Sequence, residues 1–386
     1  MHVVWRCAAA AVASLLVSFG ASAAKGPALP PPPEITEQSI DNADFAGWRT
    51  RVEARDKAIA DAARTATNEA AKKRAKKDKR SKKAKRDAPP LPPPAPPKIA
   101  ERDLPPDPFL IRVQVLLDRA HASPGAIDGH DGDNLKKAVR AYREMHGMPT
   151  DGGLDETFWT ALSADKAKTM RIYALYSEDV NGRYEQKLPT DYAKLAKLKW
   201  LGFRGPSEML AERFHLDEGL LKALNPGVDF KTAGQKILVP DTGEFPAGAV
   251  TRITVDKKLG ELRAYDEAGK ILMEAPATIG SPDTPSPSGK MTVEGVFPDP
   301  HYIYDPKKNF QQGRNKRRLD LPPGPNGPVG SMWIDLSKPT YGIHGTPEPS
   351  QISKTASHGC VRLTNWDAAD LGRMVLPKKT EVEFLE

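Results

Sequence analysis

The pattern of apolar and polar residues first marks out a helical region. Between residues 107 and 165, apolar residues recur at helical spacing over positions 109–117 and 135–146. The turns "SPGAIDGHDGDN" and "GMPTDGG" follow these stretches, and Asp155 then stands in the position of a cap before a shorter apolar segment. The pattern predicts a small domain of three short helices.

A second unit is expected over residues 199–240. Ser207 and Asp217 are placed to cap the helices "EMLAERFHL" and "EGLLKALNP", because their side chains can accept hydrogen bonds from the first N–H groups of a helix. The segment "GQKILVP" that follows has the composition of a short strand. We expect two helices followed by a strand.

Short strands are predicted over residues 249–386. Apolar and polar residues alternate around the turns "KKLG" and "EAGK", and "SMWIDL", "YGIHGT" and "EVEFL" are further strand candidates. The sequence has no phosphate-cradling glycine motif, no heptad pattern and no long parallel crossover. We therefore predict a mostly β sandwich or barrel, which makes the whole chain a multidomain α+β protein.

One long stretch inside this β region lacks a clear strand pattern. Residues 297–330 carry Tyr302, Tyr304 and Phe310 together with the basic run "GRNKRRLD". A loop of this length with several aromatic residues can act as a lid over a site, since long ordered loops tend to be functional. A flexible, solvated loop is the alternative, and the sequence favours neither.

Residues 25–106 have the composition of a stalk. Proline runs at residues 30–33 and 89–97 favour stiff, extended segments, and they flank an alanine-rich stretch in which Phe45, Trp48 and Val52 fall near helical spacing. We expect one long helix that begins near Phe45 and frays beyond about Ala71. The stalk is thus predicted to be helical or disordered.

The first 24 residues resemble a secretory signal peptide. A short segment with Arg6 precedes the apolar run Cys7–Phe19, and "ASA" follows just before Ala24. The run is shorter than the roughly 20 apolar residues that span a bilayer, so we expect an exported protein of the periplasm or cell wall with no transmembrane anchor. Removal of this segment leaves Cys360 as the only cysteine, and hence no internal disulfide.

Net charge adds little about the folded parts. The chain carries +7, whereas residues 72–86 alone contain eleven Lys or Arg and one Asp, so this block is +10 and the rest of the chain is 7 − 10 = −3. Such a block is usually solvated, and it can attract an anionic partner such as wall polymer or a membrane surface. Export argues against nucleic acid, so we expect no nucleic-acid partner.

The stretch "TASHGCVRLTN" carries the main candidate chemistry. Cys360 needs a base or a cation to lower its thiol pKa from about 8.5 before it can act as a nucleophile. His358 is poorly placed because it is so near in sequence, whereas His344, at a predicted strand end, can face the sulfur from a neighbouring strand. The N–H groups of Gly359 and Cys360 are candidate oxyanion donors, because glycine lets the backbone approach developing charge.

Two other interpretations of Cys360 were considered. A zinc ion could be held by His344, His358 and Cys360 with one open position, but "HGC" is not a common zinc spacing and no carboxylate is evident behind the ligands. An inert buried thiol would leave "HGT" and "SHGC" unexplained. We therefore expect no metal and no cofactor.

The motif "HGT" followed by "SHGCVRL" resembles the signature of the L,D-transpeptidase (YkuD-type) catalytic domain. The blocks "TPSPSGKMTV" and "LPPGPNGPVGSMWIDL" are similar as well, so the resemblance spans nearly all of residues 250–386. It implies that Cys360 is the nucleophile and His344 the base, with the histidine ring held by the backbone carbonyl of Gly345. The residues expected to bind the oxyanion or the substrate are Ser357, His358, Gly359, Arg362, Gly345 and Tyr341.

The helical regions carry resemblances of their own. Residues 107–165, with their "G.IDG" turn and the later "DG..D..T...L" pattern, resemble the small peptidoglycan-binding domain. The order helix, helix, "LNP", "GQ.I.VP" in residues 199–240 is similar to the back part of a LysM glycan-binding module.

The resemblance to L,D-transpeptidases implies a reaction. Cys360 would attack the third residue of a peptidoglycan tetrapeptide stem, release D-alanine, and pass the thioester to an amine. A stem-peptide amine gives a 3-3 crosslink, an outer-envelope protein becomes tethered to the wall, and water gives L,D-carboxypeptidation. Arg362 could pair with a substrate carboxylate or with a structural partner. The other classes considered are a cysteine hydrolase and a non-catalytic protein that binds peptidoglycan stems and glycan.

Overall fold

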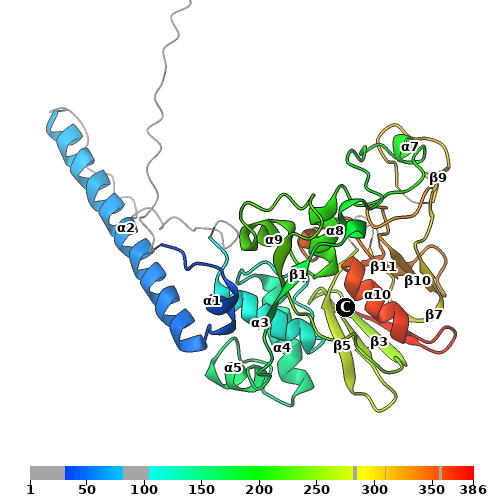
Figure 1. Cartoon of the computed structure of the whole chain (residues 1–386), viewed down its shortest axis with the longest axis horizontal. Coiled ribbons are helices and arrows are strands. Elements are labelled where there is room, and N and C mark those ends of the chain that lie inside the picture. Colours follow the sequence, from blue (N-terminus) through cyan, green and yellow to red (C-terminus); the bar gives the residue numbers. More distant parts are fainter. Residues whose placement is uncertain (1–30, 81–103, 281–284, 309, 356–358) are drawn as a thin grey trace, which may run out of the picture. The chain divides into compact units, whose positions relative to one another are not determined.

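The computed structural model describes residues 31–80, 104–280, 285–308, 310–355 and 359–386 (Figure 1). The candidate signal peptide, the second proline run, Ser357 and His358 lie outside these residues. The chain divides into two compact units, one of Met1–Pro30 with Glu53–Pro97 and one of Pro31–Val52 with Lys98–Glu386. No described helix combines the length and apolar character needed to cross a membrane.

Two helices precede the first predicted domain, α1 (Glu37–Asp41) and α2 (Phe45–Arg80). The long helix begins at Phe45 as predicted, but it continues beyond Ala71 into the basic block. Alanine, lysine and arginine all have high helix propensity, which explains the extension.

The segment before Glu53 differs from the predicted stalk. Ile40 is fully buried, and Trp48 stacks on Phe109 with ring centroids 5.3 Å apart. Residues 31–52 therefore pack with the helical domain that follows, and the prediction of a stalk without a core is wrong for them.

The three predicted helices of that domain are present as α3 (Pro108–Arg119), α4 (Asp133–Met145) and α5 (Glu156–Leu162). Asp155 caps α5 as predicted, since its carboxylate accepts a hydrogen bond from the Phe158 N–H at 2.8 Å. Apolar residues from all three helices share one core. Caps and turns depend on residues that are close together in sequence, so the sequence pattern was sufficient to predict these three helices.

The middle region is larger than expected. Its elements are β1 (Met170–Ala174), α6 (Ser177–Val180), α7 (Tyr192–Leu195), α8 (Pro206–Arg213), α9 (Glu218–Leu224) and β2 (Lys236–Pro240). Strand β1 pairs antiparallel with β2, and α8 and α9 share an apolar core with this small sheet. The packed unit thus begins at Met170 rather than at Lys199. The sequence pattern did not predict β1, because this strand is short and far in sequence from its partner.

One of the two predicted caps in this region is wrong. Asp217 does cap α9, accepting hydrogen bonds from the N–H groups of Gly219 and Leu220. Ser207 does not cap α8, because the helix already begins at Pro206, a residue suited to the first helical position. The Ser207 hydroxyl instead donates to Glu218 at 2.6 Å.

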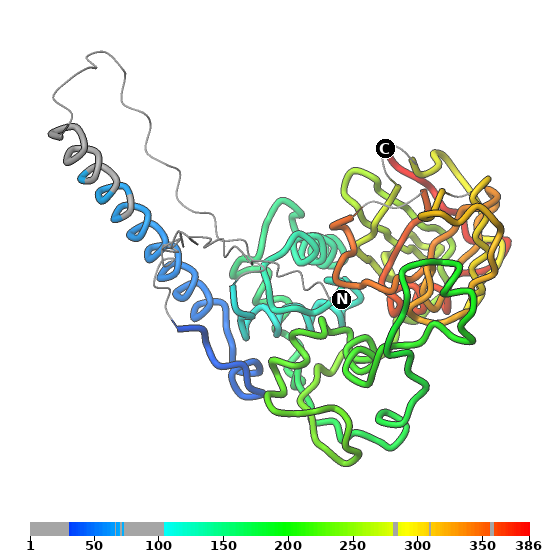
Figure 2. The backbone as a smooth tube through the Cα atoms, turned by 90° about the horizontal axis from the view of Figure 1, so that it is seen from above, coloured from blue at the N-terminus to red at the C-terminus, as the bar shows by residue number. Residues whose placement is uncertain are grey.

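The C-terminal region is mostly β, as predicted. Figure 2 shows its chain, coloured yellow-green to red, gathered in one part of the molecule. Its strands are β3 (Arg252–Asp256), β4 (Glu261–Tyr265), β5 (Ile271–Pro276), β6 (Thr278–Ile279), β7 (Gly289–Pro298), β8 (Tyr302–Tyr304), β9 (Leu319–Leu321), β10 (Met332–Leu336), β11 (Gly342–His344), β12 (Val361–Arg362) and β13 (Glu381–Leu385). Nine strands form one sheet in the order β5-β4-β3-β13-β7-β10-β11-β12-β6, and β8 and β9 form a separate hairpin. The pairs β13–β3 and β11–β12 are parallel, which the alternation alone did not predict.

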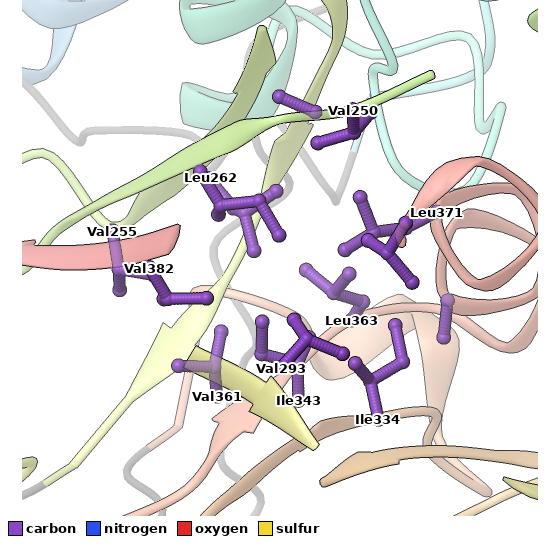
Figure 3. Close-up of a cluster of buried hydrophobic side chains, with 14 of the residues drawn as sticks. Val250, Val255, Leu262, Val293, Ile334, Ile343, Val361, Leu363, Leu371 and Val382 are labelled. Atoms are coloured by element: carbon purple, nitrogen blue, oxygen red, sulfur yellow. The ribbon is translucent and has the colours of Figure 1, made fainter. Parts of the chain in front are cut away.

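Two short helical segments complete this region, η2 (Pro349–Gln351) and α10 (Asn365–Met374). The core of the region contains Val293, Ile343 and Val361 from the sheet and Leu371 from α10, all fully buried (Figure 3). Successive side chains of a strand point to opposite faces. The residues that follow Ile343 and Val361 therefore point away from this core.

Candidate active site

The candidate catalytic residues are brought together by two neighbouring strand ends. His344 is the last residue of β11, and it pairs in parallel register with Arg362 of β12. Across the other edge of β11, His344 lies opposite Trp333 of β10. Cys360 directly precedes β12, and its side chain lines the same cleft as His344 and Arg362.

This face forms one wall of an open cleft of about 930 Å³. Cys360, His344, Arg362, Trp333, Thr340 and Tyr341 line it on the side of the sheet. The insert between β7 and β10 lines it with Pro300, His301, Tyr302, Ile303, Asp305, Lys308, Phe310 and Arg318. The long stretch that the sequence left undecided is thus in part an ordered hairpin that walls the cleft.

His344 is held as a neutral ring. Its Nδ1 lies 2.7 Å from the Gly345 carbonyl oxygen, which can only accept, so Nδ1 carries the proton and Nε2 is left as the acceptor. The ring stacks on Trp333 with centroids 5.6 Å apart and an interplanar angle of 18°. Burial, followed by the charge of Arg362, lowers the pKa of His344 to about 3, although the Gly345 carbonyl acts the other way.

The backbone after His344 is fixed by Asn365, which the sequence did not single out. The Asn365 side-chain oxygen accepts hydrogen bonds from the N–H groups of Ser331 and Thr346, each at 3.1 Å. A Cβ on Gly345 would lie only 2.2 Å from this oxygen. Glycine is therefore required at position 345, where the carbonyl that holds the histidine is positioned.

Cys360 is half-buried at the base of the cleft. Its Sγ lies 3.7 Å from the Thr340 carbonyl oxygen, an acceptor suited to a protonated thiol. Burial raises the pKa of the Cys360 thiol, whereas the Gly342 N–H and the charge of Arg362 lower it. The resting arrangement is thus a thiol and a neutral imidazole rather than an ion pair.

Arg362 brings a cation into this wall. Its Nε is buried and has no hydrogen-bond partner among the residues that the structure describes. Burial lowers the pKa of Arg362 from its ordinary value, and Tyr192 and Cys360 act in the opposite direction. Arg362 also lines the cleft, so its guanidinium places a positive charge in this wall.

Gly359 has a backbone conformation that favours glycine, with φ +106°. Its carbonyl accepts a hydrogen bond from the Ser286 hydroxyl at 2.8 Å, and a Cβ would lie 3.0 Å from Cε1 of Tyr341. This hydrogen bond holds the peptide between Gly359 and Cys360, which carries the Cys360 N–H. Tyr341 packs against it and also lines the cleft.

Of the sequence-predicted residues, the structure gathers Cys360, His344 and Arg362 at one cleft, with Gly359, Gly345 and Tyr341 supporting them. The predicted roles of Ser357 and His358 concern positions outside the described residues, and so does the zinc alternative that used His358. Sequence reasoning missed Trp333, Asn365, Ser286 and Tyr192. Only Trp333 had a local signal, since it shares the alternating strand "SMWIDL" with the buried Ile334.

Two family patterns match this chain. The L,D-transpeptidase catalytic domain (YkuD) matches residues 250–383, and the Putative peptidoglycan binding domain matches residues 107–162. Both matches fall on regions for which the sequence carried the corresponding resemblance. The segment that resembles a LysM module has no such support, and this resemblance stays a prediction.

Individual proteins are also similar to this chain. The Putative L,D-transpeptidase YkuD of Bacillus licheniformis is 31% identical over 179 residues, which is 46% of this chain and 92% of that protein. The Probable L,D-transpeptidase YbiS of Escherichia coli K12 is 28% identical over 209 residues, 52% of this chain and 68% of that protein. Among solved structures, an L,D-transpeptidase from Mycobacterium smegmatis matches with 19% identity and a TM-score of 0.30, covering 40% of this chain and 65% of that one.

Proposed function

This chain belongs to the L,D-transpeptidase family, and on that premise we propose that Cys360 carries its reaction as a covalent acyl intermediate. The enzyme is a peptidoglycan L,D-transpeptidase with a peptidoglycan-binding domain. The observation that carries the proposal is the shared cleft of Cys360, His344 and Arg362, in which the histidine has its Nε2 available as an acceptor.

The acylation step follows from the protonation states. The Cys360 thiol gives its proton to Nε2 of His344 while Sγ attacks the carbonyl carbon of the third stem residue. The N–H groups of Gly359 and Cys360 stabilise the negative charge that develops on the carbonyl oxygen. The bond from carbon to the D-alanine nitrogen then breaks, and this nitrogen takes the proton from Nε2. A thioester and free D-alanine result.

The second step reverses these roles. An acceptor amine attacks the thioester carbonyl, passes a proton to Nε2 of His344, and the proton returns to the sulfur as the thiolate leaves. With the side-chain amine of another stem the product is a 3-3 crosslink. With an amine of an envelope protein the product is a tethered protein, and with water the same intermediate gives a carboxypeptidase.

Arg362 is proposed to hold a substrate carboxylate. The terminal residue of a tetrapeptide stem carries a free carboxylate close to the bond that breaks, and Arg362 lies two positions from the nucleophile on the same face. A charged hydrogen bond from this guanidinium to the carboxylate would orient the scissile carbonyl over Sγ.

The remaining regions are proposed to bring the enzyme to its substrate. Export to the periplasm or cell wall is supported by the sequence of residues 1–24. The helical domain over residues 107–162 would bind peptidoglycan, and the middle region, with its β1-α8-α9-β2 arrangement, would bind glycan if it functions as a LysM module.

Incubation with purified disaccharide-tetrapeptide, followed by mass spectrometry, tests the reaction. Crosslinked dimers with loss of D-alanine are expected, tripeptide alone would identify a carboxypeptidase, and an unchanged substrate would indicate a binding protein. A Cys360→Ala variant should abolish product formation, and an intact protein mass after incubation with a slow substrate should show the acyl adduct only when Cys360 is present. Dimer formation by the alanine variant would refute the nucleophile assignment.

A further inference from the structure

We propose that Tyr192, which lies in the middle region outside the catalytic domain, is a substrate-binding residue of the active site. Together with Tyr302 and Arg362 it forms a subsite for a carboxylate of the donor peptide. This inference rests on the proposed function, because it names how the same cleft recognises its substrate. It means that the catalytic domain alone, residues 250–383, has an incomplete substrate-binding wall.

Tyr192 reaches the cleft from a long excursion between β1 and α8. It is the first residue of α7, a helix of four residues that Asp191 caps. Its backbone N–H donates to the Gln312 side chain at 3.2 Å, and the same glutamine donates to the Thr190 carbonyl at 2.9 Å. Gln312 belongs to the insert of the catalytic domain, so one side chain joins the two segments at the cleft.

The excursion is anchored a second time near its end. The Leu201 N–H donates to the Pro323 carbonyl at 2.8 Å, and the Leu201 carbonyl accepts from the Asn326 N–H at 2.9 Å. Leu201 is fully buried in a small core with Leu195 and with Leu321 of β9. The segment between β1 and α8 therefore packs directly against the insert between β7 and β10 of the catalytic domain.

The Tyr192 ring is fixed by aromatic neighbours of the hairpin. It contacts Tyr304 edge-on, with centroids 5.3 Å apart at 90°, and Tyr302 in the same manner at 6.0 Å and 82°. Tyr304 is fully buried and forms the base of this cluster. Tyr192 and Tyr302 are only half-buried, and both line the cleft that contains Cys360 and Arg362.

The chemistry of this corner suits a carboxylate. Burial raises the pKa of Tyr192 and of Tyr302, so both phenols remain neutral hydrogen-bond donors at ordinary pH. Arg362 supplies a positive charge with a buried donor that lacks a partner among the described residues. Lys308 and Arg318 line the same cleft, and together with Arg362 they outnumber its two acidic residues, Asp305 and Asp335.

The test compares two donor substrates, a disaccharide-tetrapeptide with its terminal carboxylate and the same compound as the terminal amide. The wild-type enzyme should prefer the carboxylate. Tyr192→Phe removes only the hydroxyl, so its kcat/KM for the carboxylate substrate should fall about tenfold while that for the amide changes little. Tyr176→Phe is the matched control, because Tyr176 lies in the same middle region, is well exposed and is absent from the cleft wall.

Two further measurements test whether Tyr192→Phe affects only substrate binding or also damages the fold or the reactivity of Cys360. The rate of Cys360 alkylation by iodoacetamide and the thermal midpoint should be unchanged in Tyr192→Phe, since neither depends on the phenol. If Cys360→Ala is inactive but Tyr192→Phe keeps the full preference for the carboxylate, the Tyr192 subsite is refuted alone. If Cys360→Ala stays active, the proposed reaction through Cys360 is refuted. The Tyr192 subsite, which rests on that reaction, is then refuted as well.

Discussion

Two histidines of this protein have nearly the same ring packing and opposite shifts of their pKa. His344 stacks on Trp333 in the active-site cleft, with centroids 5.6 Å apart at 18°. His215, which follows α8, stacks on Trp366 of α10 with centroids 5.0 Å apart at 8°. Burial acts on both rings in the same direction, because it disfavours the charged form.

The charged neighbours account for the difference. His344 faces the cation Arg362 and donates to a backbone carbonyl, and its pKa is lowered to about 3. For His215, burial also lowers the pKa, but the carboxylate of Asp118 at 2.9 Å, together with Asp367 and Asp370, raises it to a net value above the ordinary one.

The two histidines are suited to different purposes. A neutral imidazole with an available Nε2 is what proton transfer at Cys360 needs. His215, whose pKa is raised above its ordinary value, instead faces acidic side chains from separate segments, at the junction of the helical domain, the middle region and α10. Burial alone therefore does not predict whether a histidine is suited to proton transfer or to pairing with acidic side chains. The sign of the neighbouring charge does predict it.

The largest effect is expected from replacing the neutral histidine. His344→Gln removes the proton acceptor, so kcat/KM with disaccharide-tetrapeptide should fall on the order of a thousandfold. His215→Gln should leave kcat/KM nearly unchanged at a temperature where the variant is folded. Steady-state kinetics on both variants check this, and equal losses would contradict the division of roles.

The next effect concerns the cation beside His344. Arg362→Gln should raise the pKa of His344 toward its ordinary value, because the charge that helps to hold it down is gone. In the wild type the acid limb of the pH profile of kcat/KM should lie well below 6.5, and in the variant it should move upward. Arg317→Gln is the control, since Arg317 is exposed on the insert and absent from the cleft wall. An unmoved acid limb would show that Arg362 does not set this pKa.

A stability effect is expected at the junction. His215→Gln removes the imidazole that pairs with Asp118, which should lower the free energy of unfolding by about 3 kcal/mol. Chemical denaturation of the full chain measures the change. Adding Asp118→Asn to the variant should recover part of the loss, and a double variant as unstable as the sum of the single ones would argue against a direct ion pair.

The last expected effect is the pH dependence of stability. A raised folded pKa means that the contribution of His215 is complete below about pH 6.5 and is lost as pH rises through the folded value. The contribution of His344 has the opposite sign, since it is present above about pH 6.5 and is lost as pH falls toward about 3. In His215→Gln the free energy of unfolding should therefore depend less on pH above about 6.5 than in the wild type. In His344→Gln it should depend less on pH below about 6.5.

Part of the fold was predictable because its signals are local. The helices α3, α4 and α5, the cap at Asp155 and the alternation of "SMWIDL" each depend on residues within a few positions of one another. The cap predicted at Ser207 failed because Pro206 offered an equally local and better start for the helix. Strand β1 was missed because its partner β2 is far away in sequence.

The family, the candidate pair of a cysteine and a histidine from a different strand, and the mostly β character of the region that holds them could all be predicted from the amino-acid sequence. The packing of the chain was needed to show which charges surround each histidine, that Asn365 fixes the peptide after Gly345, and that Tyr192 lines the cleft. Sequence motifs record neighbours along the chain. The electrostatics of a buried group depend on neighbours in space, and Asp118 with His215 or Tyr192 with Arg362 become neighbours only when separate elements pack.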